Sequence, residues 1–239
     1  MARLVLVHGF TQTGASWSPV RTLLEAGGHT VEAPDAPGHG TRAGTPMDLW
    51  RGADVLAGDV QRATWVGYSM GGRLALHVAL AHPEVVERLV LVGSSPGIAT
   101  AAERAARRAA DAELAGHLLD VGVSAFLDEW LAQPLFASLP SDAADRASRL
   151  TNTAEGLAAS LRLAGTGAQD SLWDRLDQID VPTLLVVGGD DAKFRNLAFA
   201  MAAGLPDATI FELGGCGHAC HLEAPERFAD AVLEFVEAN

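Results

Sequence analysis

The sequence contains a serine, an acidic residue and a histidine whose types and order could support nucleophilic or acid–base chemistry. Ser69 is the centre of the pentapeptide 67–71, Gly-Tyr-Ser-Met-Gly, which matches the pattern G-x-S-x-G. A serine hydroxyl is unreactive without a base, and the base needs an acid that orients it. We predict that Ser69 is the nucleophile or base, His218 its partner and Asp191 the orienting acid, because the chain order Ser, Asp, His accompanies this serine motif.

Each partner of the serine has a rival close by in the chain. Asp190 precedes Asp191, and we prefer Asp191 because it lies further past the end of the preceding strand-like run. His221 follows His218, and we prefer His218 because it comes directly after Gly217. His221 is expected to enter the next helix instead.

The first strand-like run ends at His8, Gly9 and Phe10. In folds built around this serine motif, the loop at that place donates one backbone N–H to an oxyanion, and the residue after the serine donates the other. We therefore assign the oxyanion hole to the N–H groups of Phe10 and Met70. The His8 side chain is expected to brace the loop rather than to react.

Short apolar runs alternate with helical patterns along most of the chain. Continuous runs of valine and leucine indicate strands buried on both faces, and therefore a parallel sheet covered by helices. The alternation predicts an α/β fold with a mostly parallel, doubly wound sheet. The predicted strands cover residues 4–7, 64–68, 88–92, 183–187 and 208–213, and the clearest helices cover 70–81, 194–203 and 225–236.

One segment interrupts this alternation. Residues 97–173 contain no good strand pattern and indicate several helices. We predict that they form a helical cap over the carboxyl edge of the sheet, where open α/β sheets bind ligands. The predicted domains are a core of residues 1–96 and 174–239 and a cap (lid) of residues 97–173.

Arginines occur where they could contact a ligand. Arg73 lies one helical turn beyond the serine motif, and Arg104, Arg107 and Arg108 share one face of a cap helix by their spacing. Guanidinium groups are suited to clamping carboxylates, and a solvated helix face is the alternative for one or two of them. Trp130, also in the cap, is either core or a pocket wall.

The composition limits the class of protein. The chain has 239 residues and a formal net charge of −13 at pH 7, which argues against binding nucleic acid or an anionic membrane. No apolar stretch approaches the roughly 20 residues of a membrane helix, and no signal peptide is evident. We expect a cytoplasmic protein that is a monomer or a small homo-oligomer.

The two cysteines, Cys216 and Cys220, give no disulfide framework. Together with His218 and His221 they crowd four metal-binding side chains into six residues, without the paired spacing of structural zinc sites. We therefore predict no metal, and we expect the cysteines to be small packing residues.

Several motifs, most of them in the predicted cap, resemble those of one family, the 2-succinyl-6-hydroxy-2,4-cyclohexadiene-1-carboxylate (SHCHC) synthases. These are the menaquinone-pathway members of the α/β-hydrolase superfamily. The matching stretches are G-Y-S-[LM]-G-G-R at 67–73, E-R-x-A-R at 103–107, W-x-x-Q-P-[VL]-F at 130–136 and D-x-K-F at 191–194, with weaker likeness at 152–156, 165–167, 171–173 and the histidine loop. The serine motif is shared by the whole superfamily, so the cap motifs carry the functional inference.

The resemblance implies the α/β-hydrolase fold with an inserted cap and a lyase reaction that needs no cofactor. The substrate would be a small anionic carboxylate, 2-succinyl-5-enolpyruvyl-6-hydroxy-3-cyclohexene-1-carboxylate, which loses pyruvate to give SHCHC. Ser69 would abstract a ring proton, and the oxyanion hole would stabilise charge on the succinyl carbonyl oxygen. The family residues that line the pocket map to Tyr68, Arg73, Arg107, Trp130 and Arg149, with Arg162 as a second candidate near Arg149.

Two other functions fit parts of the sequence. A carboxylesterase or C–C bond hydrolase of the same fold would use the same triad, and a non-catalytic binding protein could keep the fold. The intact triad argues against the binding protein, and several convergent arginines argue against an esterase for neutral esters. The chain begins at the strand before His8, so the sheet is expected to be smaller at one edge than the full fold.

Overall fold

The computed structural model describes residues 1–58 and 60–238 and contains a central sheet of six strands. The strands lie in the order β2-β1-β3-β4-β5-β6, and every pair of neighbours is parallel. The predicted α/β fold with a parallel, doubly wound sheet is therefore confirmed. The strands are β1 (Arg3–Val7), β2 (Thr30–Glu32), β3 (Ala63–Tyr68), β4 (Val86–Val92), β5 (Thr183–Gly188) and β6 (Ala208–Leu213).

All of the predicted strands are present, and β2 is an additional strand that the sequence did not reveal. It has three residues, of which only Val31 is buried. A strand this short has no apolar run or alternation that can be recognised. It pairs with β1 and forms one edge of the sheet.

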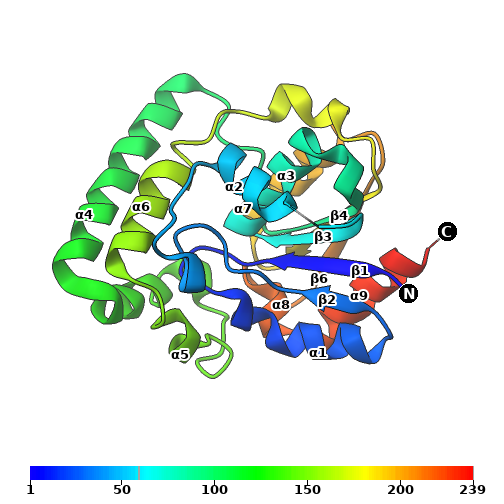
Figure 1. Ribbon diagram of the computed structural model, residues 1–239, viewed down its shortest axis with the longest axis horizontal. Coiled ribbons are helices and arrows are strands. Elements are labelled where there is room, and N and C mark those ends of the chain that lie inside the picture. The colour runs from blue at the N-terminus through cyan, green and yellow to red at the C-terminus, as the bar shows by residue number, and fades with distance from the viewer. Residues whose placement is uncertain (59, 239) are drawn as a thin grey trace.

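Strand β1 shows why both faces of the sheet must be covered. Successive side chains of a strand point to opposite faces, so Leu4 and Leu6 pack on one side and Val5 and Val7 on the other. Helices α1 (Ser18–Ala26) and α9 (Pro225–Glu237) cover the Leu4 side, next to the short α8 (Cys220–Glu223). The opposite side is covered by α2 (Leu49–Ala57), α3 (Met70–Ala81) and α7 (Ala192–Ala202) (Figure 1).

The strand order places a ligand-binding crevice next to β1. From β1 the chain moves outward to β2 and then returns to pair β3 with the other side of β1. Ligands of open α/β sheets bind at such a reversal, beyond the carboxyl ends of the strands. The loops after β1 and β3, which hold Phe10 and Ser69, leave the sheet at this point.

Between β4 and β5 the described chain has helices and loops but no strand. The helices are α4 (Ala101–Leu131), α5 (Arg146–Arg149) and α6 (Ala154–Ala164). Thr100 caps α4 by accepting from the Glu103 N–H at 3.2 Å, and Gly122 interrupts the helix with a φ of 77°.

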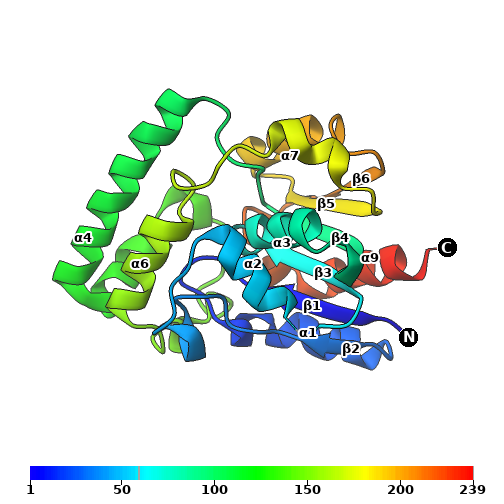
Figure 2. The ribbon, with the colours of Figure 1, turned by 45° about the horizontal axis from the view of Figure 1, so that its top comes forward.

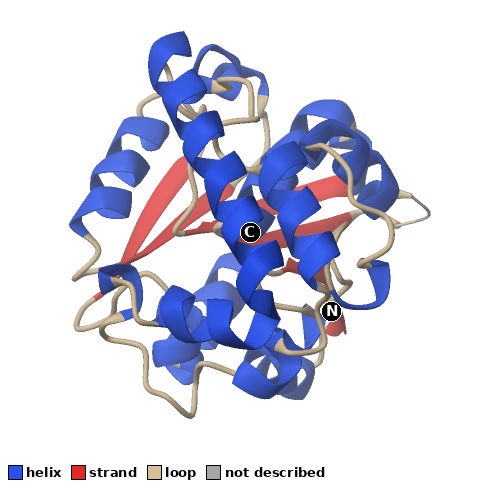
Figure 3. Cartoon of the chain, turned by 90° about the vertical axis from the view of Figure 1, so that its left-hand side faces the viewer, coloured by secondary structure: helices blue, strands red, loops and turns tan. Residues whose placement is uncertain are grey.

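Helices α4 and α6 lie side by side, away from the sheet (Figures 1 and 2). They have an apolar cluster of their own, which includes Leu118, Phe126 and Leu157. Figure 3 shows this layer of helices from its own side, in front of the strands. The division of the chain into a core of 1–96 and 174–239 and a cap of 97–173 stays a prediction.

No helix in the described part of the chain combines the length and the apolar character that a membrane span requires.

Candidate active site

Ser69 occupies a sharp turn between β3 and α3. Its φ of 51° and ψ of −106° are strained for a residue that has a Cβ. The turn is held against β4, because the Ser69 N–H donates to Val92 O at 2.8 Å and Ser94 Oγ donates to Ser69 O at 3.1 Å. The turn is also so tight that a Cβ on Gly67 or Gly71 would collide with neighbouring backbone. This explains the glycines of the serine motif, and it leaves the Ser69 side chain at the sheet edge.

His218 and Asp191 meet at the same edge. The His218 Nδ1–H donates to Asp191 Oδ2 at 2.8 Å, and the two residues are 3% and 8% exposed. Asp191 also caps α7, since its Oδ1 accepts from the Phe194 N–H at 3.2 Å. Burial alone would raise the pKa of Asp191, but the hydrogen bond and charge of His218 and the Phe194 N–H hold it below its ordinary value. The carboxylate is therefore ionised at neutral pH.

Ser69 and His218 line the same cavity. Within residues 1–58 and 60–238, Ser69 Oγ makes no hydrogen bond to the imidazole. Catalytic hydrogen bonds are often long without a ligand and tighten in the reacting complex. The Ser69–His218 contact therefore stays a prediction, whereas the His218–Asp191 contact is formed.

The loop after β1 is fixed by buried polar contacts. His8 Nδ1–H donates to Gly9 O at 2.8 Å, and its Nε2 accepts from the Ala36 N–H at 2.9 Å. Gln12 Oε1 accepts from the Gly9 N–H at 2.8 Å. His8 thus braces the loop that carries Phe10, as its sequence position suggested. Among the described groups, the N–H of Phe10 and that of Met70 have no acceptor, so both are available to an oxyanion.

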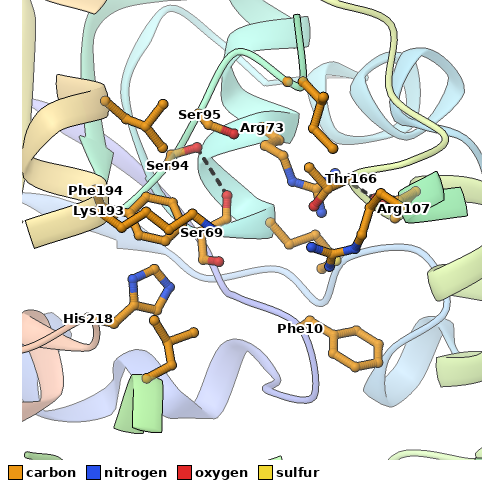
Figure 4. A pocket seen from close by; sticks show the side chains of 18 of the residues that line it. Phe10, Ser69, Arg73, Ser94, Ser95, Arg107, Thr166, Lys193, Phe194 and His218 are labelled. Carbon is orange, nitrogen blue, oxygen red and sulfur yellow. Dashed lines mark hydrogen bonds between the residues drawn. The ribbon is translucent and has the colours of Figure 1, made fainter. Parts of the chain in front are cut away.

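A cavity of about 430 Å³ lies over Ser69, between the sheet edge and the helices α4 and α6. Among the described residues its wall includes three cationic side chains, Arg73, Arg107 and Lys193, and no carboxylate (Figure 4). This is the reverse of the charge balance of the whole chain. The cavity can therefore attract an anion that the rest of the protein repels.

Arg73 and Arg107 are each held by protein acceptors. Arg73 is buried, and its Nη1–H donates to Ala164 O at 2.6 Å. Burial and the neighbouring Arg107 lower the pKa of Arg73 to about 10, so it is still cationic at neutral pH. Arg107 Nε–H donates to Asp111 Oδ1 at 2.7 Å, and Asp111 Oδ2 accepts from the Gly167 N–H at 3.2 Å.

The two arginines beside Arg107 have other partners. Arg104 Nη1–H donates to Ile98 O at 3.0 Å and Ala99 O at 2.8 Å. Arg108 Nε–H donates to Gly167 O at 3.2 Å. Of the three arginines on this helix face, Arg107 is the one that lines the cavity.

A second, smaller cavity of about 30 Å³ adjoins the first and shares Phe10, Ser69, Trp130 and His218 with it. Tyr68 and Arg149 line this smaller space. Arg149 is 1% exposed; its Nε–H donates to Ala144 O at 2.7 Å and its Nη1–H to Thr11 Oγ1. Arg162, the rival of Arg149, is exposed on α6 and lines neither cavity.

Trp130 forms part of the wall of both cavities. Its ring stacks on Phe126 and meets the edge of Phe10 at centroid distances of 5.8 and 5.1 Å. The indole N–H is buried and has no acceptor among the described residues.

Asp190 and His221, the alternatives to Asp191 and His218, do not line the cavity. Asp190 is exposed. His221 is fully buried between Tyr68 and Trp17, at ring-centroid distances of 4.2 and 4.5 Å, and neither ring nitrogen has a described partner. Burial holds the pKa of His221 well below its ordinary value, so the ring is neutral packing.

Several cavity residues were not singled out from the sequence. Ser95, Thr166 and Trp173 line the wall, and Asp111 fixes Arg107 from behind. Asp111 follows Arg107 by four residues on a helix, a spacing that favours an ion pair and could have revealed it. Lys193 lies within the D-x-K-F stretch, whose lysine was not assigned a role.

In the described part of the chain, no group of three or more His, Cys, Asp or Glu side chains is arranged to hold a metal ion.

Comparison with known proteins agrees with this geometry. The model of the alpha/beta hydrolase family matches residues 4–231. A Bacillus subtilis (strain 168) protein, provisionally named 2-succinyl-6-hydroxy-2,4-cyclohexadiene-1-carboxylate synthase, is 37% identical over 247 residues, covering 98% of this chain and 89% of its own. The synthase of that name from Pectobacterium atrosepticum is 31% identical and is covered over 93% of its length, with 98% of this chain aligned.

Solved structures of other proteins superpose on this chain over nearly its full length. MenH from S. aureus superposes with a TM-score of 0.87 at 32% identity, over 99% of this chain and 93% of that one. A thermophilic esterase from Thermogutta terrifontis superposes with a TM-score of 0.84 at 24% identity, which shows a shared fold.

The chain belongs to the α/β-hydrolase superfamily. Within that superfamily, the resemblance to the SHCHC synthase family is confirmed by the relatives of that name.

The buried histidines behind the oxyanion loop predict a pH dependence of stability. Burial lowers the pKa of His8 from 6.5 to about 4 and that of its neighbour His39 to about 3. Between pH 6.5 and 5 the unfolded chain binds protons at these imidazoles and the folded chain does not, so the free energy of unfolding falls as the pH falls. Each histidine should account for about 2 kcal/mol over this interval.

Urea unfolding at pH 7 and pH 5 measures this effect in the wild type and in His39→Leu. The variant has one buried imidazole fewer, so its loss of stability between the two pH values should be about 2 kcal/mol smaller. Equal losses in the two proteins would contradict the assignment of His39 as a buried neutral group.

Proposed function

We propose that this enzyme is a lyase that eliminates pyruvate from 2-succinyl-5-enolpyruvyl-6-hydroxy-3-cyclohexene-1-carboxylate and gives SHCHC in menaquinone biosynthesis. The observation that carries the proposal is the cationic cavity over Ser69, which has no described carboxylate in its wall although the chain has a net charge of −13. The relatives that are named SHCHC synthases and align over nearly the full chain support it.

The charges of the cavity suit this substrate. It carries carboxylates on its succinyl arm, on its ring and on its enolpyruvyl ether. Arg73 and Arg107 would each pair with such a group, and a hydrogen bond to a charged partner is worth about 1.5–3 kcal/mol. A neutral ester would offer these cations no charged partner, so it would gain no such ion pair.

The triad residues would act in proton abstraction. Ser69, activated by His218, would take the proton from the ring carbon that bears the succinyl group. The electron pair left there forms the bond from C2 to C3, the ring double bond moves to C4 and C5, and the C5–O bond breaks. Enolpyruvate leaves with that electron pair and becomes pyruvate when a proton is returned to its methylene carbon.

Stabilisation of the intermediate charge would come from the backbone. Removing the proton next to the succinyl carbonyl places negative charge on the carbonyl oxygen. The N–H groups of Phe10 and Met70, which have no described acceptor, would donate to it. Asp191, held ionised behind His218, would keep the imidazole in the tautomer whose Nε2 can accept the serine proton. No acyl-enzyme is needed.

The helices α4 and α6 would have a different task, which is to limit access of water. Helix α4 carries Arg107 and Trp130 over the cavity, and it packs on α6 through an apolar cluster of their own. Excluding water strengthens each ion pair with the substrate. This role agrees with the predicted cap of residues 97–173.

Pyruvate release tests the proposal directly. Purified enzyme mixed with the enolpyruvyl substrate should produce pyruvate, followed as NADH consumption by lactate dehydrogenase. Ser69→Ala should lower kcat by at least about 10⁴-fold, because the proton acceptor is lost, while its circular dichroism and urea midpoint stay close to wild type. The enzyme should also be slow on p-nitrophenyl esters.

An enzyme that releases no pyruvate above the rate without enzyme, and that cleaves p-nitrophenyl esters rapidly, would instead be a carboxylesterase. Hydrolysis of the C–C bond that joins the succinyl carbonyl to the ring, detected as free succinate, would point to the C–C bond hydrolases. Either result would contradict the lyase assignment.

The contribution of the arginines can be isolated with a matched pair of variants. Arg107→Ala removes a cation of the cavity wall, and Arg108→Ala removes the adjacent cation, which is bound to Gly167 O outside the wall. Arg107→Ala should lower kcat/KM about tenfold or more, which corresponds to about 1.4 kcal/mol or more. Arg108→Ala should stay within about threefold of wild type.

A kcat/KM of Arg107→Ala within threefold of wild type would show that this guanidinium does not bind the substrate. Equal losses in both variants would show that only the overall charge matters.

A further inference from the structure

Lys193 is a cation of the cavity wall that the reaction scheme above does not use. It is the only lysine among the seventeen basic residues of the chain. It lies in the first turn of α7, two residues after Asp191, and lines the same cavity as Ser69. In Figure 4 it lies on the other side of Ser69 from Arg73 and Arg107.

The ammonium of Lys193 has few stabilising contacts in the free protein. Within the described residues its ammonium forms no hydrogen bond or ion pair. A cation in the first turn of a helix also lies at the positive end of the helix dipole, where it is disfavoured. The Phe194 ring and the ionised Asp191 offset this only through space, so the N–H groups of the ammonium stay available to a ligand.

The surroundings of Lys193 connect it to the reacting groups. Its Nζ lies 5.2 Å from the centroid of the Phe194 ring, and that ring packs on the His218 ring at a centroid distance of 4.4 Å. An anion bound by Lys193 would therefore lie beside His218. Arg73 and Arg107 approach the cavity from α3 and α4, and lie apart from Lys193 in the close-up (Figure 4).

The three cationic side chains also differ in how far they can move. Arg73 is held by Ala164 O and Arg107 by Asp111, so both guanidiniums have fixed positions. A lysine carries a compact charge on a flexible stem of four carbons. Lys193 is exposed at the mouth of the cavity and can follow a carboxylate that moves.

We infer that Lys193 is a specificity-determining residue that binds one carboxylate of the substrate on the His218 side of the cavity, while Arg73 and Arg107 bind another on the far side of Ser69. The inference rests on the proposed function and deepens it. It defines the substrate class as compounds with anionic groups on both sides of the reacting ring carbon. An analogue with only one of these groups would leave part of the cationic wall unpaired and would be selected against.

A charge-matched set of variants tests this inference. Lys193→Met keeps the length of the side chain and removes its charge, and Lys193→Arg restores the charge. Arg195→Met is the control, because Arg195 lies on the same helix, pairs with Glu212 at 3.5 Å and does not line the cavity. It changes the net charge of the chain by the same amount as Lys193→Met.

The KM of Lys193→Met for the enolpyruvyl substrate should rise about tenfold, the loss of one charged hydrogen bond, while kcat stays within about threefold. Lys193→Arg should recover most of the loss, and Arg195→Met should leave KM within about twofold. Three analogues can be compared, each methylated on one of the three carboxylates. For one of them, wild type and Lys193→Met should have the same KM.

Three results would overturn the inference. The first is a KM of Lys193→Met within about twofold of wild type. The second is an equal rise in KM for Arg195→Met, which would reduce the effect to net charge. The third is a fall in kcat at unchanged KM, which would mean that Lys193 acts through Asp191, whose pKa it helps to lower, and not on the substrate.

A binding measurement separates failure of this inference from failure of the proposed function. Because the chain has one lysine, the primary amino groups that acetic anhydride can acetylate are Lys193 and the exposed Met1 amino group, and peptide mass spectrometry distinguishes the two. In the Ser69→Ala protein, substrate at about four times its Kd should slow acetylation of Lys193 about fivefold, with Met1 as the unprotected reference.

Protection without pyruvate release by the wild type would refute the lyase reaction and keep Lys193 as a carboxylate-binding residue. Pyruvate release without protection of Lys193 would keep the reaction and refute the inference.

Discussion

The close packing of α3 against the carboxyl ends of β1, β3 and β4 is the constraint on which the site depends. Gly67 and Gly71 leave no room for a Cβ where the helix meets the strands, and Ser69 bridges them with a φ of 51°. That strained turn holds the hydroxyl at the edge of the sheet. The loops after β5 and β6 end at the same edge, because all strands are parallel, and they bring Asp191 and His218 into contact there.

The charge of the cavity around Ser69 is opposite to that of the whole chain. The chain as a whole is strongly acidic, yet the cavity wall presents cations. Arg73 and Arg107 are held by a carbonyl and by the buried Asp111, so their positions do not depend on a ligand. Such preorganisation lowers the entropic cost of binding, and it favours a substrate with several carboxylates over the neutral esters that the same triad could cleave.

Much of this arrangement could be predicted from the sequence, because it depends on local patterns. The buried strands have continuous apolar runs, and α3 begins and ends where its period indicates, at Met70 and Ala81. The edge strand β2 was missed because three residues give no pattern, and α1 and α2 because they are short. In the site, the positions of Ser69, Asp191 and His218 followed from the ends of the strands. Which of the cap arginines faces the cavity did not follow, because helical spacing cannot show that Arg104 turns back to Ile98 O and Ala99 O or that Arg108 bonds to the distant Gly167 O.

The most direct test of the account concerns the proton that Ser69 and His218 would remove. Substrate with deuterium on the ring carbon that bears the succinyl group can be mixed with excess enzyme, and the single-turnover rate of pyruvate formation compared with that of ordinary substrate. The account predicts a slower reaction of the deuterated compound, because breaking this C–H bond is the step that the triad catalyses. Identical rates for the two compounds would contradict it.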